Sequence, residues 1–311
     1  HRRDTAFPSR SRAQCTHFRF GTRARRYDQR YGVMIAAASS VTVRFGDTVA
    51  LENVSVELTD GTILAAVGGD GAGKTTLLRA LAREVVCDSG TITSPDKQHL
   101  GYLPAGPGCW AALTVRENLD FVGEMYGLRG DELVARRDEM IERAGLTVAT
   151  DRPAGALSGG MRRKLATSMA LIHRPLLVIL DEPSTGVDPV SRIDLWRMIS
   201  ESAAAGSAVI MSTTYLDEAE RAAQLLVLDE GRTLARGSYA DLRAGFTGTI
   251  TSSPHPIRRE WSWRRGRERH EYWPEDSTER PSSGATTVDP DLEDIVISLS
   301  LRRQLVSAGA R

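Results

Sequence analysis

The sequence is poor in cysteine, in long apolar runs and in net charge, and each shortage excludes a class of protein. Its three cysteines, Cys15, Cys87 and Cys109, have neither the density of a disulfide scaffold nor metal-ligand spacing, so a reduced, cytosolic location is expected. No stretch approaches the roughly 20 apolar residues of a membrane helix, so any channel must come from another chain. The 40 basic and 40 acidic residues cancel, and bulk charge therefore predicts no polyanion partner.

The first 33 residues differ in character from the rest of the chain. They are rich in arginine and show no apolar periodicity, and Met34 comes just before the first expected strand. We expect residues 1–33 to be disordered or non-native, the product of an over-extended reading frame or an artefact. A transit peptide is the alternative, because the segment is nearly free of acidic residues.

Strands and helices alternate between residues 34 and 245. Residues 41–45 and 54–58 alternate apolar and polar side chains, which predicts half-buried antiparallel strands. Continuous apolar runs at 63–67, 176–180 and 208–212 predict buried strands, and helices are expected over 75–83 and within 113–143. This order predicts an α/β fold with a mainly parallel core sheet, helices on its faces and an antiparallel β subdomain.

Three units are expected from this organisation. A single α/β domain spans residues 34–245, with a helical subdomain at about 106–172 and no internal repeat. Residues 246–311 form a C-terminal accessory extension, in which 277–288 are rich in Ser, Thr and Gly and predict a loop. Residues 291–303 return to an amphipathic pattern that fits a strand or a helix.

A glycine-rich loop follows the first buried strand and precedes a helix. It matches the pattern GxxxxGK followed by Ser or Thr, with the residues Gly68, Gly69, Asp70, Gly71, Ala72, Gly73, Lys74 and Thr75. Glycines let backbone N–H groups surround phosphates, and the helix start directs its positive dipole end at them. We expect Lys74 to neutralise phosphate charge, Thr75 to ligate Mg²⁺, and Thr76 to bind beside it. A glycine-rich turn without a ligand is the alternative.

The second buried strand ends in two acids, Asp181 and Glu182. Ligands of parallel sheets bind beyond the carboxyl ends of the strands, so Asp181 is expected to face Mg²⁺, directly or through water. Glu182, one residue further, is the candidate catalytic base that orients or deprotonates the attacking water. A solvated strand end is the alternative for this pair alone.

A third motif lies between the other two: Leu157, Ser158, Gly159, Gly160 and Met161 precede a helical run. A serine and two glycines at a helix start can bind an anion, or Ser158 can simply cap the helix. With the phosphate loop before it and the Asp181–Glu182 strand after it, the chain resembles the P-loop NTPases of the ATP-binding cassette (ABC) family from about residue 40 to 245.

The resemblance implies a role for each motif. In the family, Ser158, Gly159 and Gly160 would bind the γ-phosphate of ATP held by an opposite subunit, and Asp188 would contact that subunit. Phe45 would stack on adenine. A single cassette then implies a homodimer or heterodimer that binds ATP and Mg²⁺.

The subfamily most similar to the chain is that of bacterial ABC-2-type drug and antibiotic exporters. The stretches 113–119, 215–220 and 291–295 carry this likeness. It implies an ATPase at the cytoplasmic face of the membrane, energising a separate permease that exports drug-like or other small molecules. Soluble cassettes of translation or DNA repair are disfavoured, since the chain has neither a second cassette nor an inserted coiled coil.

Two positions depart from the family pattern. Ala105 stands where a glutamine usually reaches Mg²⁺ and the attacking water, and Thr214 replaces the switch histidine. Threonine can donate a hydrogen bond to a phosphate oxygen but carries no positive charge. We expect good MgATP binding with slow hydrolysis in the chain's own site; a regulatory module with low turnover, or adequate substitution by Thr214, are the alternatives.

Arginine and aromatic residues mix at 258–273 in the extension. They fit either a nucleic-acid or membrane-surface patch or, as we favour, a β-hairpin turning at Arg265 and Gly266 with Trp261 and Trp263 packed on the cassette. Acidic residues dilute the charge of this segment, so no nucleic acid partner is expected. His255 and His270 show no ligand partners and are expected at the surface.

Overall fold

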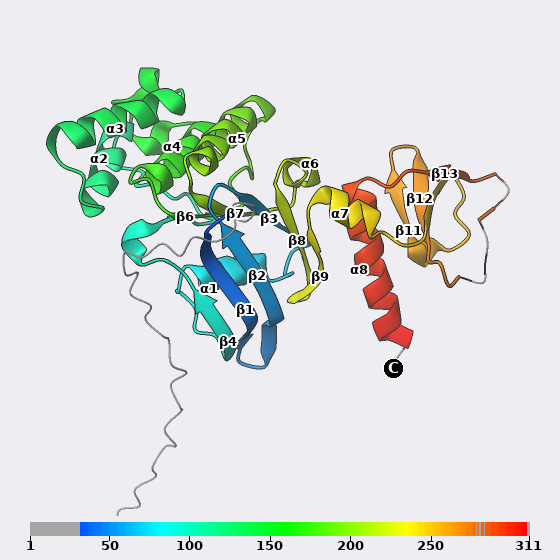
Figure 1. Ribbon diagram of the computed structural model, residues 1–311. Helices are drawn as coiled ribbons and strands as arrows, with labels where there is room; N and C mark the ends of the chain where they lie inside the picture. Colours follow the sequence, from blue (N-terminus) through cyan, green and yellow to red (C-terminus); the bar gives the residue numbers. More distant parts are fainter. Residues whose placement is uncertain (1–31, 278, 280, 283, 310–311) are drawn as a thin grey trace, which may run out of the picture.

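The computed structural model describes residues 32–277, 279, 281–282 and 284–309 (Figure 1). The prediction for the arginine-rich segment therefore falls almost entirely outside the described residues. Across the described residues, none of the helices is both long and apolar enough to span a membrane.

A six-stranded sheet in the order β5-β6-β7-β3-β8-β9 forms the centre of the cassette. Its parallel strands are β5 (Leu100–Leu103), β6 (Leu177–Asp181), β7 (Ala208–Thr213), β3 (Ile63–Val67) and β8 (Gln224–Asp229). The edge strand β9 (Arg232–Gly237) pairs antiparallel with β8. The strands predicted at 63–67, 176–180 and 208–212 are thus confirmed to within one residue.

Both faces of this sheet are covered, which explains the continuous apolar runs. Leu177 and Ile179 belong to one buried cluster, whereas Val178 and Leu180 belong to the other. Because successive side chains of a strand point to opposite faces, every residue of such a strand must be apolar.

On one face lies an antiparallel sheet, β2-β1-β4, built from β1 (Met34–Phe45), β2 (Thr48–Thr59) and β4 (Ser89–Thr93). Its inward side chains share a core with α1 (Lys74–Leu81), which follows β3 (Figure 1). The antiparallel strands predicted at 41–45 and 54–58 are confirmed as parts of β1 and β2, and Val41 lies opposite Val54; residues 41–45 pair with 48–54.

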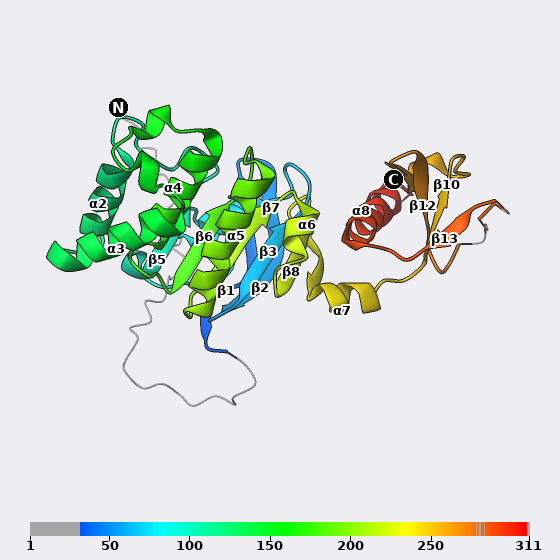
Figure 2. The same cartoon turned by 90° about the horizontal axis from the view of Figure 1, so that it is seen from above.

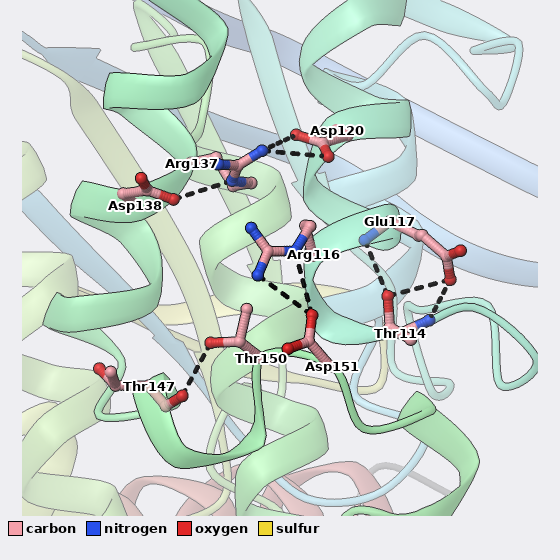
Figure 3. A network of polar contacts seen from close by, with 9 residues as sticks. All are labelled: Thr114, Arg116, Glu117, Asp120, Arg137, Asp138, Thr147, Thr150 and Asp151. Atoms are coloured by element: carbon pink, nitrogen blue, oxygen red, sulfur yellow. Dashed lines mark hydrogen bonds and ion pairs between the residues drawn. The ribbon is translucent and has the colours of Figure 1, made fainter.

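On the other face lie α2 (Val115–Met125), α3 (Gly130–Arg143), α4 (Gly159–Leu171) and α5 (Pro189–Ala204) (Figure 2). Thr114 caps α2 by accepting from the Glu117 N–H at 3.1 Å, and the Thr114 N–H donates to the Glu117 carboxylate at 2.8 Å. These bonds hold the pKa of Glu117 below its ordinary value. Figure 3 shows this capping box, formed by Thr114 and Glu117. It also shows two ion pairs of α2: Arg116 with Asp151, and Asp120 with Arg137 of α3.

Helix α6 (Leu216–Ala219) connects β7 to β8, and after β9 the chain leaves the sheet through α7 (Tyr239–Ala244) and forms the extension. This part contains a second antiparallel sheet and a helix (Figure 2), namely β10 (Thr249–Ser253), β11 (Ser262–Arg265), β12 (Glu268–Trp273), β13 (Thr286–Val288) and α8 (Leu292–Gly309). The hairpin is confirmed, with Arg265 opposite Glu268 and its turn one residue later than expected. The segment 277–288, expected as loop, contains the short strand β13.

Two expectations for the extension are wrong. Trp261 and Trp263 pack within the extension, against Tyr272 and His270, because these two residues project from the same face of β12. His270 is not at the surface: its side chain is only 15% exposed, and its Nδ1 lies 2.8 Å from the Asp294 carboxylate of α8. The aromatic residues therefore hold this second sheet and its helix together.

The extension is tied to the cassette through α8. The Arg303 guanidinium donates to the Asp229 carbonyl oxygen and lies 2.9 Å from the Glu230 carboxylate. Asp229 is the last residue of β8, and Glu230 begins the turn from β8 to β9 of the central sheet. The division near residue 245, between α7 and β10, stays a proposal.

Asn118→Ala is expected to lower the free energy of unfolding by about 1–3 kcal/mol, because it leaves buried polar groups unpaired. The Asn118 side chain is fully buried, accepts from the Trp110 N–H at 2.8 Å, and donates to the carbonyl oxygens of Trp110, Leu113 and Thr114. Arg116→Ala on the same helix removes an exposed ion pair and should lower the free energy of unfolding by less than Asn118→Ala does. Denaturant unfolding measures both; equal losses would contradict the prediction.

Candidate active site

The ends of three neighbouring parallel strands bring the predicted site residues to one edge of the central sheet. Val67 lies opposite Thr213, and Asp181 lies opposite Ser212. The glycine-rich loop after β3, Glu182 after β6 and Thr214 after β7 therefore start from the same level of the sheet. Ala105 reaches this edge as well, because Leu103 of β5 lies opposite Leu180.

The loop from Gly68 to Thr75 has a backbone that requires glycine at two positions. Gly68 has φ +154°, and a Cβ there would lie 2.2 Å from the Leu228 carbonyl oxygen. Gly73 has φ +99°, and its Cβ would lie 2.7 Å from the Ala50 carbonyl oxygen. These close approaches fix the curve of the loop and place Gly69, Asp70, Gly71 and Ala72 between them.

Lys74 and the start of α1 complete this loop. The Lys74 side chain is buried, and its Nζ donates to the carbonyl oxygens of Gly68 and Gly69 at 2.8 and 3.0 Å. No side chain of the described residues caps α1, so the N–H groups of its first turn face the loop. In this turn Thr75 is exposed and Thr76 is half-buried. The loop thus concentrates an ammonium group and backbone donors, which suits a phosphate chain.

Asp181 is a buried carboxylate, and only one of its oxygens has a partner among the described residues. It is 1% exposed; its Oδ1 accepts from the Ser212 hydroxyl at 2.6 Å, while its Oδ2 has no hydrogen bond to any residue that the structure describes. A buried, unpaired carboxylate oxygen is unfavourable unless a cation approaches it. Oxygen ligands are those that Mg²⁺ prefers, so the donor set of Asp181 and the Thr75 hydroxyl fits this ion.

Glu182 follows in a left-handed backbone conformation, with φ +48°. Its N–H donates to the Ser212 hydroxyl at 2.8 Å, and its Oε2 accepts from the Thr185 hydroxyl at 2.9 Å. A non-glycine residue in this conformation stores about 1–3 kcal/mol of strain and persists only where its surroundings impose it. The chain therefore turns sharply here, and the Glu182 side chain leaves the line of the strand.

Ser212 was not identified from the sequence as a site residue, although it contacts both acids. Its hydroxyl accepts from the Glu182 N–H and donates to the Asp181 carboxylate. The sequence shows only a serine at the end of the apolar run 208–212. The pairing of β7 with β6 makes it the neighbour of Asp181, and no local signal reports that pairing.

Thr214 is exposed, but the backbone beside it is held. The Thr213 hydroxyl accepts from the Tyr215 N–H at 3.0 Å and donates to the Glu218 carboxylate at 3.3 Å. Burial raises the pKa of Glu218 above its ordinary value. Ala105 is also exposed, and Phe45 is 51% exposed at the end of β1, accessible to a stacking partner.

The signature residues lie at another place, where α4 and α5 begin. Ser158 caps α4 by accepting from the Met161 N–H at 3.3 Å, and Asp188 caps α5 by accepting from the N–H groups of Val190 and Ser191. The Ser191 bonds hold the pKa of Asp188 below its ordinary value. A Cβ on Gly160 would lie 3.1 Å from the Asp188 carboxylate.

This second group belongs to the opposite face of the sheet from the phosphate loop. Helices α4 and α5 pack on one face, whereas α1, which the loop begins, packs on the other. Ser158, exposed Gly159, Gly160 and Asp188 therefore cluster with one another around two helix starts. The signature residues thus form a second helix-start group, separate from the phosphate loop.

A strand, a phosphate-binding loop and a helix, with an acidic pair at the end of β6, two strands away in the same parallel sheet, define a P-loop nucleotide-binding protein. The family model "ABC transporter" matches residues 51–185. The chain is 34% identical over 233 residues to the Nod factor export ATP-binding protein I of Ralstonia nicotianae, covering 70% of this chain and 73% of that protein. The chain belongs to the ABC transporter family of ATP-binding proteins, which are ATPases.

Other relatives agree. The probable multidrug ABC transporter ATP-binding protein YbhF of Escherichia coli is 39% identical over 207 residues, 63% of this chain. The chain spans 36% of the length of YbhF. The daunorubicin resistance protein DrrA2 of Streptomyces coeruleorubidus is 35% identical over 209 residues, 64% of this chain and 65% of that protein.

Solved structures of the family share the fold. The ATP-binding subunit of an ABC transporter superposes with a TM-score of 0.63 at 26% identity, over 68% of this chain and 92% of that chain. A dimeric cassette, MJ0796 bound to ADP and Pi, has the same fold at 20% identity, with a TM-score of 0.60 over 66% of this chain and 98% of that chain. The α/β cassette predicted from the sequence is confirmed.

Ser212→Ala is expected to lower kcat for ATP by about tenfold, equivalent to one lost hydrogen-bonding centre, and to raise the Mg²⁺ concentration needed for half-maximal rate. The variant removes the hydroxyl that orients Asp181 and supports the Glu182 backbone. Steady-state hydrolysis at varied Mg²⁺ measures both effects.

Ser207→Ala is the matched control. This buried hydroxyl lies just before the other end of β7 and donates to the Pro175 carbonyl oxygen at 2.7 Å. The control should lower stability and leave the Mg²⁺ dependence unchanged. Identical Mg²⁺ curves for all three proteins would disprove the role of Ser212.

Proposed function

We propose that this chain is the ATP-binding and ATP-hydrolysing subunit of an ABC exporter, which energises a separate membrane permease. The observation that carries the proposal is the arrangement of the phosphate loop and the Asp181–Glu182 pair at one sheet edge. The names of the relatives, which include multidrug and daunorubicin resistance proteins, support export of drug-like or other small molecules.

In this proposal, the residues from Gly68 to Thr76 bind the phosphates of ATP, and Phe45 stacks on its adenine. Thr75 and Asp181 hold Mg²⁺, which would neutralise charge on the phosphate oxygens. Glu182 orients the attacking water and accepts its proton. The Glu182 backbone has φ +48°, and its carboxylate accepts from the Thr185 hydroxyl at 2.9 Å.

Two chains are needed for a complete site. Ser158, Gly159, Gly160 and Asp188 cluster on the face of the sheet opposite to α1, so they serve an ATP molecule bound by a second cassette. The dimeric MJ0796 cassette shares the fold and shows that such a pair forms in that protein. A homodimer and a heterodimer both satisfy this geometry.

An exposed apolar patch on the helical subdomain offers a surface for the permease. Trp110 and Phe121 are 46% and 43% exposed and contact each other edge-to-face, with ring centroids 4.7 Å apart. Met125, one turn further along α2, is 69% exposed. Contiguous exposed apolar side chains mark interaction sites, and this one would hold the chain at the cytoplasmic face of a membrane.

The catalytic surroundings of Glu182 are reduced relative to the family pattern. The Ala105 side chain cannot bind Mg²⁺ or water, and Thr214 carries no positive charge. Own-site hydrolysis is therefore slow, while Ser158 to Gly160 still complete a partner's site. A regulatory cassette with low turnover, outside any transporter, is the second candidate that these two residues favour.

Co-purification tests the transporter proposal. Glu182→Gln should abolish measurable turnover, since a positioned base contributes about 10²–10⁴ in rate, while ATP binding is retained. Isolated from its native membranes in MgATP, this variant should retain a polytopic membrane protein at a stoichiometric ratio. Recovery of the protein without any membrane protein, in ATP and in its absence, would favour the regulatory cassette.

Ala105→Gln combined with Thr214→His should raise the own-site ATPase rate about tenfold or more, because both replacements add groups that contact phosphate, Mg²⁺ or water. Single-turnover hydrolysis at saturating MgATP measures the change, with Glu182→Gln added to the same background as the blank. A wild-type rate equal to that of the double variant would show that Thr214 substitutes adequately.

A further inference from the structure

Arg163, in the second turn of α4, is a buried cation with an unusual set of partners. It is 7% exposed, and its guanidinium donates to five backbone carbonyl oxygens. Burial lowers the pKa of Arg163, while the charges of Asp181 and Glu182 oppose that shift. Arginine stays protonated under such conditions, so all of these bonds are charge-assisted.

The five carbonyl groups belong to two separate segments of the chain. Nη1 donates to Pro104 at 3.0 Å and to Gly106 at 2.7 Å, on either side of Ala105. Nη2 and Nε donate to the three consecutive residues at the end of β6: Asp181 at 2.5 Å, Glu182 at 2.7 Å and Pro183 at 3.0 Å. One planar group therefore ties the loop after β5 to the loop after β6.

We propose that Arg163 is a positioning residue for ATP hydrolysis, which holds the Glu182 backbone in its left-handed turn and couples it to residues 104–106. This inference rests on the proposed role of Glu182 as the base. The methyl side chain of Ala105 cannot connect this loop to Glu182. The Arg163 guanidinium makes the connection instead, through the backbone carbonyl groups on both sides of Ala105.

Two features distinguish this role from helix packing. First, Arg163 bonds to carbonyl groups of loops at the site edge, and the strained Glu182 conformation needs external support. Second, the adjacent Lys164 is equally buried but points to α5, where its Nζ lies 3.1 Å from the Asp194 carboxylate. Of these two buried cations of α4, Arg163 thus binds the loops at the candidate site, and Lys164 binds helix α5.

The experiment compares Arg163→Met and Arg163→Lys with the control Lys164→Met, in the full chain and with its permease where available. We expect Arg163→Met to lower kcat by about tenfold or more, with KM for ATP changed less than about threefold, because a base is displaced while the phosphate loop is intact. Lysine should restore little of the rate, since one ammonium group cannot bridge both segments. Lys164→Met should lower the Tm without this kcat loss.

Hydrogen exchange gives a second readout that needs no turnover. The amides of Ala105 and Gly106 in one loop, and of Glu182, Ser184 and Thr185 in the other, should exchange faster together in Arg163→Lys, and not in Lys164→Met. Arg163→Lys serves also if Arg163→Met fails to fold. Three results would overturn the inference. The first is a wild-type kcat in the Arg163 variants, and the second is a loss of kcat and of ATP affinity in parallel. The third is faster exchange over the whole of α4.

The proposed function fails in a different way. A wild-type chain that binds ATP but never hydrolyses it, alone or with the permease, removes the role of Glu182. The exchange measurement still decides whether Arg163 couples the two loops.

Discussion

The parallel register of β6, β7 and β3 is the constraint on which the site depends. It places Asp181 opposite Ser212 and Val67 opposite Thr213, so three loops leave the sheet side by side. Each strand is buried on both faces, by the helical layer on one side and by α1 with the antiparallel sheet on the other. A slip of one residue would reverse both faces of a strand, and the apolar cores therefore hold the register that the chemistry needs.

Within that frame, the polar groups of the site are held mainly by backbone atoms. Gly68 and Gly73 lie against carbonyl oxygens, and Lys74 reaches back to its own loop. Arg163 and Ser212 meet at the end of β6, one bonding to its carbonyl groups and the other to its side chain and N–H. The strained turn at Glu182 is thus supported from two sides before any ligand contributes.

In the proposed dimer, the two helix-start groups on opposite faces of the sheet make each cassette dependent on a second one for a complete ATP site. The phosphate loop begins a helix on one face of the sheet, and the signature begins a helix on the other. The helical layer also carries the exposed Trp110–Phe121 pair, on the same side as the signature. In the proposed transporter, contacts to a permease and to a second cassette would both involve this helical layer. The layer contacts the Glu182 backbone through Arg163.

The sequence alone determined the fold class, the central strands and the candidate residues from Gly68 to Thr76, because loop, strand and helix signals there are local in the chain. Ala105 and Thr214 were also evident as departures from a pattern. The roles of Ser212 and Arg163 were decided only by the tertiary structure, as were the partners of His270 and Trp263. Their partners lie between 7 and 59 residues away in the chain, and strand pairing and helix packing, which no local pattern encodes, bring them into contact.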